Sequence, residues 1–169
     1  MMRPHSRKPS ISILAMAAFA ALSLVRAFAQ SDAGPFEHLV GTWAGSGTIA
    51  MSNGTSERIR CRAKYSVSPS GLILHQLLRC ASDSYTFNVR SDLVYQDSGV
   101  KGTWNEETRR VSGSVSGRVS DGKIAMTVAG TGFTATYVLA MRSDQQSVTI
   151  KPDGGDISAI SVELRRAQG

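Results

Sequence analysis

Two neighbouring stretches, residues 57–67 and 72–81, constrain the fold of this chain more than any other feature. In the first stretch, apolar and basic residues alternate along the chain, and this period of two is typical of a strand with one buried face. The apolar residues are Ile59, Cys61, Ala63, Tyr65 and Val67, and the basic residues between them are Arg58, Arg60, Arg62 and Lys64. The pattern predicts a strand with one face in a core and a strongly basic outer face.

The second stretch is predicted to pair with the first in a β-hairpin. Its apolar residues lie at even positions, which we expect to point inward: Leu72, Leu74, Leu78 and Cys80. Matching the two apolar faces predicts three cross-strand pairs: Val67 with Leu74, Ala63 with Leu78, and Cys61 with Cys80. Opposed positions of this kind have Cα atoms about 4.5–5.5 Å apart, within reach of a disulfide. The chain is therefore predicted to form one disulfide, Cys61–Cys80.

The turn between the two stretches favours a different register. Ser68-Pro69-Ser70-Gly71 resembles a type I turn closed by a glycine bulge, which would shift the pairing by one residue and place the two cysteines on opposite faces. Burying the wrong face of a whole strand costs far more than accommodating one extra bulge. We therefore predict the register that sets the cysteines opposite each other.

The first 29 residues are predicted to be a signal peptide. A basic start precedes an apolar run at residues 11–25, and Ala27-Phe28-Ala29 provides a cleavage site. A membrane-spanning anchor needs about 20 apolar residues, and Arg26 ends the run sooner. We predict cleavage after Ala29, no transmembrane span in the mature protein, and a periplasmic or secreted location.

Removing the leader changes what the charge of the chain implies. Four of the 19 Lys and Arg residues and none of the 13 acidic residues lie in the leader, so the net charge falls from +6 to +2. We therefore expect no nucleic-acid partner. The rest is predicted to comprise a flexible lead-in, residues 30–36, and one domain, residues 37–169. In an exported chain, two cysteines outside a C-x-x-C motif favour one disulfide over a metal site.

The domain is predicted to contain about ten short strands joined by tight turns. Strict alternation recurs at residues 85–95 and 133–141, and Asp121-Gly122 is a strong hairpin signal. Pairing about that turn sets Val119 opposite Ile124 and Val115 opposite Val128. Regular short strands indicate an all-β, antiparallel up-and-down β-barrel of about eight to ten strands. A flat sandwich is the alternative, and glycines inside several strands favour the barrel.

A helical turn is predicted at residues 36–40. Its end overlaps the segment Leu39-Val40-Gly41-Thr42-Trp43, which opens the series of strands. This segment resembles the Gly-x-Trp start of lipocalin-like (calycin) barrels, with nitrobindin-type and fatty-acid-binding branches nearest in strand count. The resemblance implies that Trp43 closes one end of the barrel. Nitrobindin-like proteins hold haem through a late histidine, and this chain has none after His75, so we expect neither haem nor another cofactor. The chain also resembles small exported inhibitors of proteases and lysozyme.

No catalytic arrangement is recognisable in the sequence. His38 and His75 are the only histidines after the leader, and neither lies in a known catalytic motif. Glu106 and Glu107 are adjacent, so we interpret them as residues of a solvated turn and not as a paired acid and base. Clustered metal ligands are not apparent. The sequence therefore predicts no catalytic residues, no metal site and no enzyme.

Two sets of residues remain as candidate sites. Inward aromatic residues are expected to line or fill a cavity: Tyr65, Phe87, Tyr95, Phe133 and Tyr137. Small inward residues favour an open cavity: Ala63, Gly113, Gly117 and Ala135. The basic row, Arg58, Arg60, Arg62 and Lys64, is either a solvated face or a site for lipid headgroups, a cell-wall polymer or an acidic protein.

Two functions follow from these candidates. The leading hypothesis is an exported, non-enzymatic protein that binds a small, mostly apolar ligand inside its barrel. The alternative is a periplasmic interaction protein, or a protease or lysozyme inhibitor, that acts through its outer surface or loops.

Overall fold

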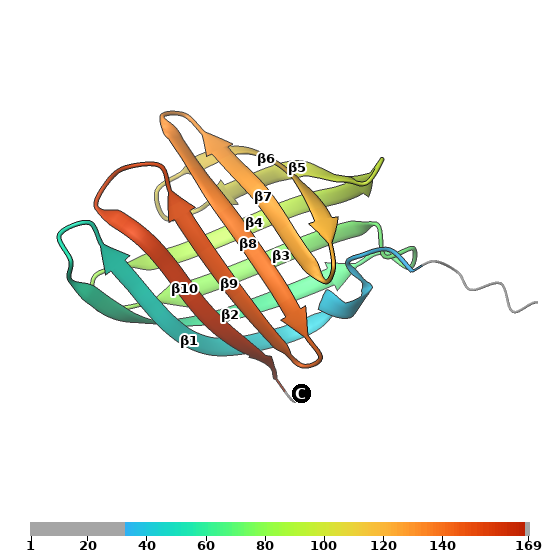
Figure 1. Cartoon of the computed structure of the whole chain (residues 1–169), viewed down its shortest axis with the longest axis horizontal. Coiled ribbons are helices and arrows are strands. Elements are labelled where there is room, and N and C mark those ends of the chain that lie inside the picture. The colour runs from blue at the N-terminus through green and yellow to red at the C-terminus, as the bar shows by residue number, and fades with distance from the viewer. Residues whose placement is uncertain (1–32, 168–169) are drawn as a thin grey trace, which may run out of the picture. The chain divides into compact units, whose positions relative to one another are not determined.

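Ten antiparallel strands close into a barrel in the computed structural model, which describes residues 33–167 (Figure 1). Each strand pairs with its neighbours in the sequence, and β1 pairs with β10 to complete the ring. The strands are β1 Gly41–Met51, β2 Ser56–Val67, β3 Ile73–Ala81, β4 Thr86–Gln96, β5 Gly99–Glu106, β6 Val111–Ser120, β7 Lys123–Gly130, β8 Phe133–Arg142, β9 Gln145–Pro152 and β10 Ile157–Arg166. The predicted all-β barrel is confirmed, and closure leaves no exposed sheet edge.

The register of the cysteine hairpin is the one that the apolar pattern predicts. β2 and β3 pair Val67 with Leu74, Ala63 with Leu78, and Cys61 with Cys80, and the two sulfur atoms are bonded. The glycine turn forms as well: Gly71 has a φ of 70° and its N–H donates to the Ser68 carbonyl at 2.9 Å. The turn and the predicted register coexist because the loop extends through Leu72. The next residue, Ile73, accepts at its carbonyl from the Ser68 N–H at 3.0 Å.

Leu72 differs from the prediction that it points inward. It lies in this loop, one residue before β3, and its side chain is 37% exposed. The period of two applies only within the strand, so it does not extend to a turn residue.

The hairpin of β6 and β7 also has its predicted pairs. Val119 lies opposite Ile124 and Val115 lies opposite Val128. The two turn residues, Asp121 and Gly122, both have positive φ, at 48° and 72°. This geometry matches the right-handed twist of the flanking strands, which explains why an Asp-Gly pair specifies the turn.

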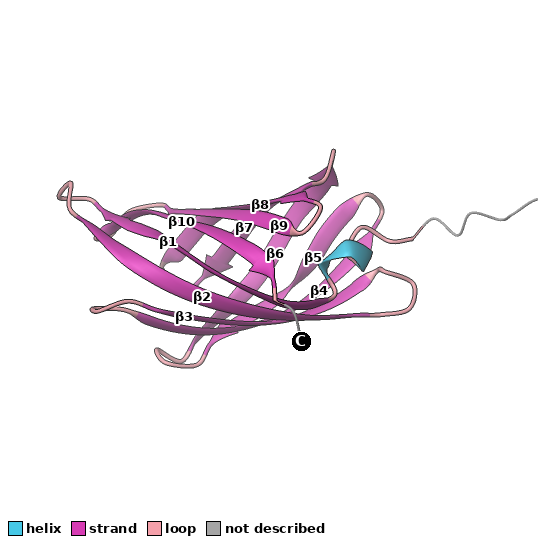
Figure 2. Cartoon of the chain, turned by 90° about the horizontal axis from the view of Figure 1, so that it is seen from below, coloured by secondary structure: helices cyan, strands magenta, loops and turns pink. Residues whose placement is uncertain are grey.

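One end of the barrel is closed by the predicted helical turn, a 3₁₀ helix η1 at Glu37–Leu39. Figure 2 shows this short helix beside the strand ends. Phe36, Leu39 and Trp43 are fully buried there. The Trp43 indole N–H donates to the Leu39 carbonyl at 2.8 Å, and the guanidinium of Arg166 lies 4.3 Å from the centre of the Trp43 ring. Trp43 therefore joins η1 to the first strand and the last.

The predicted flexible lead-in ends in residues that are held in place. The N–H of Gly34 donates to the Ser70 carbonyl at 3.0 Å, and the N–H of Phe36 donates to the Gly71 carbonyl at 3.2 Å. Together with the burial of Phe36, these bonds attach residues 34–36 to the turn between β2 and β3. The predicted signal peptide, residues 1–29, lies outside the described residues.

No helix within residues 33–167 combines the length and the apolar character needed to cross a membrane.

Candidate functional site

A cavity of about 460 Å³ occupies the interior of the barrel. The lining of the cavity includes Tyr85, between β3 and β4, and Thr131, between β7 and β8. These connections lie at the end of the barrel opposite η1 and Trp43, so the cavity extends to that end. Of the 29 lining residues, five carry polar side chains other than tyrosine: Gln76, Ser91, Glu106, Arg109 and Thr131. The wall is therefore mostly apolar, with polar groups at a few positions.

Four of the five predicted aromatic residues line this cavity: Tyr65, Phe87, Phe133 and Tyr137. Tyr95 does not line it. Tyr95 points inward from β4, but it lies opposite the fully buried Val100 beside the turn to β5, and it packs half-buried against the core there. Alternation predicts the face of the strand correctly, and the cavity ends before the strand does.

The small inward residues create less space than the sequence suggested. Ala135 lines the cavity, whereas Ala63 is fully buried and does not. A Cβ atom at Gly113 would lie 1.7 Å from the Ala129 carbonyl oxygen, and one at Gly117 would lie 2.2 Å from the Ala125 carbonyl oxygen. The backbone of β7 therefore approaches both glycines closely, and the side chains of Trp104 and Met126 lie 2.8 Å from the same two Cβ positions.

The mouth of the cavity is built from aromatic rings and one arginine. Tyr85 and Phe87 stack with ring centres 6.1 Å apart and planes 3° from parallel. The Arg109 guanidinium lies 4.9 Å from the centre of the Phe87 ring, and it donates to the Thr86 carbonyl at 3.0 Å. This arrangement holds one cation over an apolar rim.

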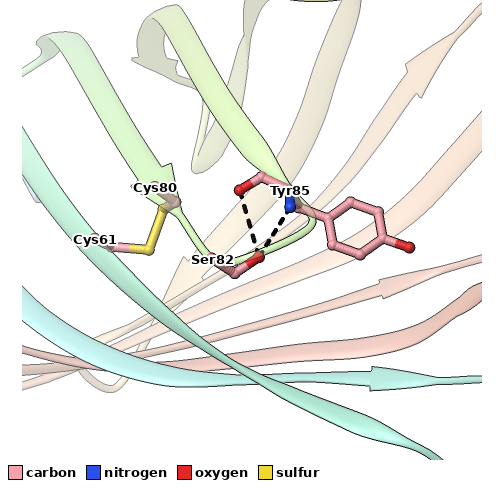
Figure 3. Close-up of a disulfide and its surroundings, with 4 residues drawn as sticks. All are labelled: Cys61, Cys80, Ser82 and Tyr85. Carbon is pink, nitrogen blue, oxygen red and sulfur yellow. Dashed lines mark hydrogen bonds between the residues drawn. A yellow bond between two sulfur atoms is a disulfide. The ribbon is translucent and has the colours of Figure 1, made fainter.

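The disulfide lies just inside the mouth, since both Cys61 and Cys80 line the cavity. Figure 3 shows it beside the turn that carries Tyr85. The Ser82 hydroxyl accepts from the N–H of Tyr85 at 3.0 Å and lies 3.4 Å from its carbonyl oxygen. The disulfide and the Ser82 bonds therefore support the strand ends and the turn that present the Tyr85 ring.

The sequence suggested that Glu106 and Glu107 are both residues of a solvated turn, but only Glu107 is solvated. Glu107 is exposed and forms an ion pair with Arg90. Glu106 is only 5% exposed, and its carboxylate accepts from the backbone N–H groups of Asn88 at 2.9 Å and Arg109 at 2.7 Å. Burial acts to raise the pKa of Glu106, but these hydrogen bonds outweigh it and the pKa is lowered. Glu106 is therefore an ionised group that holds the turn at the mouth.

Deeper in the barrel, polar side chains from four strands face one another. Tyr65, Gln76 and Ser91 are successive cross-strand neighbours on β2, β3 and β4, and Tyr137 on β8 lies near Gln76 and Tyr65. Sequence reasoning missed Gln76 and Ser91 as site residues. The available signal was Gln76 itself, which interrupts an otherwise apolar row of inward positions in β3.

His38 and His75, the two histidines among residues 33–167, lie outside the cavity. His75 points outward from β3, where its Nδ1 atom lies 2.5 Å from Oδ1 of Asp92, and both side chains are more than half exposed. His38 is exposed in η1. Within residues 33–167, no cluster of three His, Cys, Asp or Glu side chains could hold a metal ion.

The basic row occupies the outer face of β2. Arg58, Arg60, Arg62 and Lys64 are all exposed, and none of the salt bridges among residues 33–167 involves them. On β3, Arg79 lies directly opposite Arg62. The positive surface is therefore denser than the sequence of one strand indicates. The density has an energetic cost, because like charges at directly opposed positions destabilise a sheet.

Comparison with known proteins gives matches to solved structures alone, since no family model and no curated protein matches the chain. The protein Rv2717c from M. tuberculosis superposes with a TM-score of 0.62 at 12% identity, covering 78% of this chain and 94% of that one. The S-type phycobiliprotein lyase CPES from Guillardia theta superposes with a TM-score of 0.59 at 13% identity, covering 79% and 91%. The fold is calycin-like. At these identities the similarity concerns the fold alone.

The lyase overturns one prediction. The sequence predicts that this protein is not an enzyme, because no catalytic motif is recognisable in it. That exclusion is wrong, since a chain with the same calycin-like fold is named as a lyase. A calycin-like barrel is therefore compatible with enzymatic activity.

Proposed function

We propose that this protein is exported and binds a small, mostly apolar ligand inside its barrel. The observation that carries the proposal is the 460 Å³ cavity, whose lining is mostly apolar and which lies in a barrel that has Phe36, Leu39 and Trp43 buried at one end. Ligand cavities commonly measure about 300–1,000 Å³ and combine apolar walls with a few polar groups. The disulfide supports an oxidising compartment, periplasmic or secreted.

Filling the cavity is expected to abolish this binding. Ala135 is 1% exposed and lines the cavity from β8, so Ala135→Phe places a ring in the ligand's volume. We expect purified, delipidated protein to bind the hydrocarbon fluorophore diphenylhexatriene at one site. The variant should bind it at least about tenfold more weakly, a loss of roughly 1.4 kcal/mol. Fluorescence titration measures both affinities.

The control uses the next residue on the same strand. Thr136 is exposed on the outer face, so Thr136→Phe adds the same ring without entering the cavity and should leave the affinity unchanged. Thermal unfolding of both variants establishes that they are folded. Absence of saturable binding in the wild-type protein, or equal weakening by the two variants, contradicts the proposal.

The dense positive face supports a second proposed role, docking on an anionic lipid surface. Five exposed bases lie together on β2 and β3, with Arg79 opposite Arg62. Leu77, which is 41% exposed, lies opposite Lys64. Basic side chains beside an exposed apolar one suit a membrane interface, which offers anionic headgroups and an apolar layer.

Reversing two charges on this face is expected to remove vesicle binding. Each base near an anionic membrane contributes about 1 kcal/mol. Arg60→Glu/Arg62→Glu should therefore weaken retention on phosphatidylglycerol vesicles by at least about 30-fold at low salt. The difference should shrink as salt rises, because a Debye length of about 10 Å at 0.1 M screens the charges. Vesicle co-sedimentation measures retention.

The matched control makes the same change in net charge elsewhere. Arg118→Glu/Lys123→Glu alters exposed residues of β6 and β7 and should leave retention intact. Unchanged retention of the β2 variant identifies the basic row as a solvated face. If the β2 variant loses binding to an acidic protein but keeps its binding to vesicles, the face is assigned to a protein partner instead.

A further inference from the structure

The inner half of the cavity contains a group of four uncharged polar side chains, Tyr65, Gln76, Ser91 and Tyr137, which we call the inner polar group. All four line the cavity. Tyr65, Gln76 and Ser91 form a row across β2, β3 and β4, because each lies directly opposite the next. Tyr137 lines the same cavity from β8, close to Gln76 and Tyr65. Strands far apart in the sequence thus bring hydrogen-bonding groups to one place.

These side chains are buried to a degree that requires hydrogen-bond partners. The exposed fractions are 3% for Tyr65, 7% for Gln76, 8% for Ser91 and 8% for Tyr137. The Tyr65 hydroxyl donates to Oε1 of Gln146 at 3.2 Å. A buried polar group without a partner costs about 1–3 kcal/mol, and one amide side chain offers two donors and an acceptor. A ligand with a hydrogen-bonding group would use the capacity that remains.

The amide of Gln146 is further evidence that this end of the barrel favours polar contacts. Gln146 on β9 is fully buried behind Tyr65. Its Nε2 atom has no hydrogen-bond partner within residues 33–167. The Oε1 atom of the same amide accepts from the Tyr65 hydroxyl, so Gln146 provides a partner for Tyr65 and for none of the other three side chains of the inner polar group.

The charge of the region decides which head group suits it. The two ionisable side chains of opposite sign that line the cavity, Glu106 and Arg109, lie 3.5 Å apart beside the β5–β6 turn at the mouth. Burial raises the pKa of Tyr137 to about 12, and burial together with nearby Tyr137 raises the pKa of Tyr65. Both phenols therefore stay neutral. An ionised carboxylate or ammonium at this depth would lack a counter-charge, which is far more costly than a neutral group.

The wall between the inner polar group and the mouth is apolar. On β4 the inward positions after Phe87 are Val89 and then Ser91, so about 13 Å of strand separates Phe87 from Ser91. On β3, Leu78 and Cys80 continue from Gln76 toward the mouth. This length suits an aliphatic or aromatic body in line with a polar head.

We propose that the ligand enters head first, with an uncharged carbonyl, hydroxyl or amide group bound by Gln76, Ser91 and Tyr137 and an apolar body that extends past Val89 to Phe87. The inference rests on the proposed function, because it names the chemical class of ligand for the same cavity. The proposal excludes three other alignments that the shape of the cavity alone leaves open: a charged head inside, a charged head at the mouth, and no polar head.

The test compares three competitors of similar size: 1-decanol, undecane and decanoate at pH 7.5, each displacing diphenylhexatriene from the full mature chain. We expect 1-decanol to bind at least about tenfold more tightly than either of the others, because two neutral hydrogen bonds contribute about 0.5–1.5 kcal/mol each. In Gln76→Leu/Ser91→Ala the preference should fall below about threefold, while the affinity for diphenylhexatriene stays the same or rises.

The matched control places the same two substitutions on the outer face. Gln96 on β4 and Ser116 on β6 are exposed, so Gln96→Leu/Ser116→Ala should keep the preference for 1-decanol. Tyr137→Phe provides a milder second variant that retains the ring and removes one hydroxyl, and it should lower the preference by about three- to fivefold.

The outcomes separate the two proposals. If diphenylhexatriene binds but 1-decanol is not preferred, or the preference survives both inner variants, the head-group inference is overturned and the proposed function stands. If diphenylhexatriene does not bind to the wild-type chain, both are overturned. A preference that is lost in the inner variants and kept in the outer one supports both.

Discussion

Trp43→Ala is expected to lower the free energy of unfolding by about 3–5 kcal/mol, as large aromatic truncations in cores do. The Trp43 side chain is fully buried between η1 and the barrel. The truncation removes its packing, its hydrogen bond to the Leu39 carbonyl and the ring beneath the Arg166 guanidinium. A domain of this size is stable by only about 5–15 kcal/mol. Urea unfolding, followed by far-UV circular dichroism, measures the loss.

Trp104→Ala is the control for this prediction. Trp104 is half-buried and lines the cavity, so its truncation should cost less stability and weaken diphenylhexatriene binding more. A loss below about 1 kcal/mol in Trp43→Ala is too small for a core aromatic residue and contradicts the assignment of Trp43 as the plug. Weakened ligand binding at unchanged stability would assign Trp43 to the binding site instead.

Removing the disulfide is expected to cost about 3 kcal/mol in Cys61→Ala/Cys80→Ala, according to the chain-entropy model for a loop of this length. The two cysteines are 19 residues apart in the sequence, so the bond restricts a moderate loop in the unfolded chain. Both side chains are almost completely buried on the cavity wall, and alanine leaves a small gap there. Denaturant unfolding of the oxidised protein and the variant gives the difference.

Two measurements accompany this comparison. A reducing agent should destabilise the wild-type protein and leave the double variant unchanged, which separates the bond from the loss of side-chain volume. Intact-mass analysis of protein taken from the periplasm should show a gain of two hydrogens on reduction. Two free thiols in that protein contradict the disulfide.

Short-range patterns in the sequence determined the strands, their inward faces and the order in which they pair. The register of β2 and β3 followed from two alternating rows, and that of β6 and β7 followed from Asp121-Gly122. Both hairpins are local, so each pair depends on residues that lie close together in the chain. With every strand paired to the next, a closed barrel was the arrangement that left no edge exposed. The disulfide followed from the same register.

Only the tertiary structure decided how deep each inward residue lies and what it meets there. Alternation assigns a face to a residue, but it has no information about position along the barrel axis. For that reason Tyr65 and Tyr95 looked equivalent in the sequence, although Tyr65 lines the cavity and Tyr95 packs at the closed end.

Contacts between distant strands account for the rest of the difference. Gln76, Ser91 and Tyr137 lie on β3, β4 and β8, and each alone resembles an ordinary polar substitution in a strand. Closure of the ring between β1 and β10 brings β8 across the interior from β3 and β4, so these groups meet in one buried region. Their convergence is a long-range packing effect, because it depends on the curvature of the whole sheet and not on any local pattern.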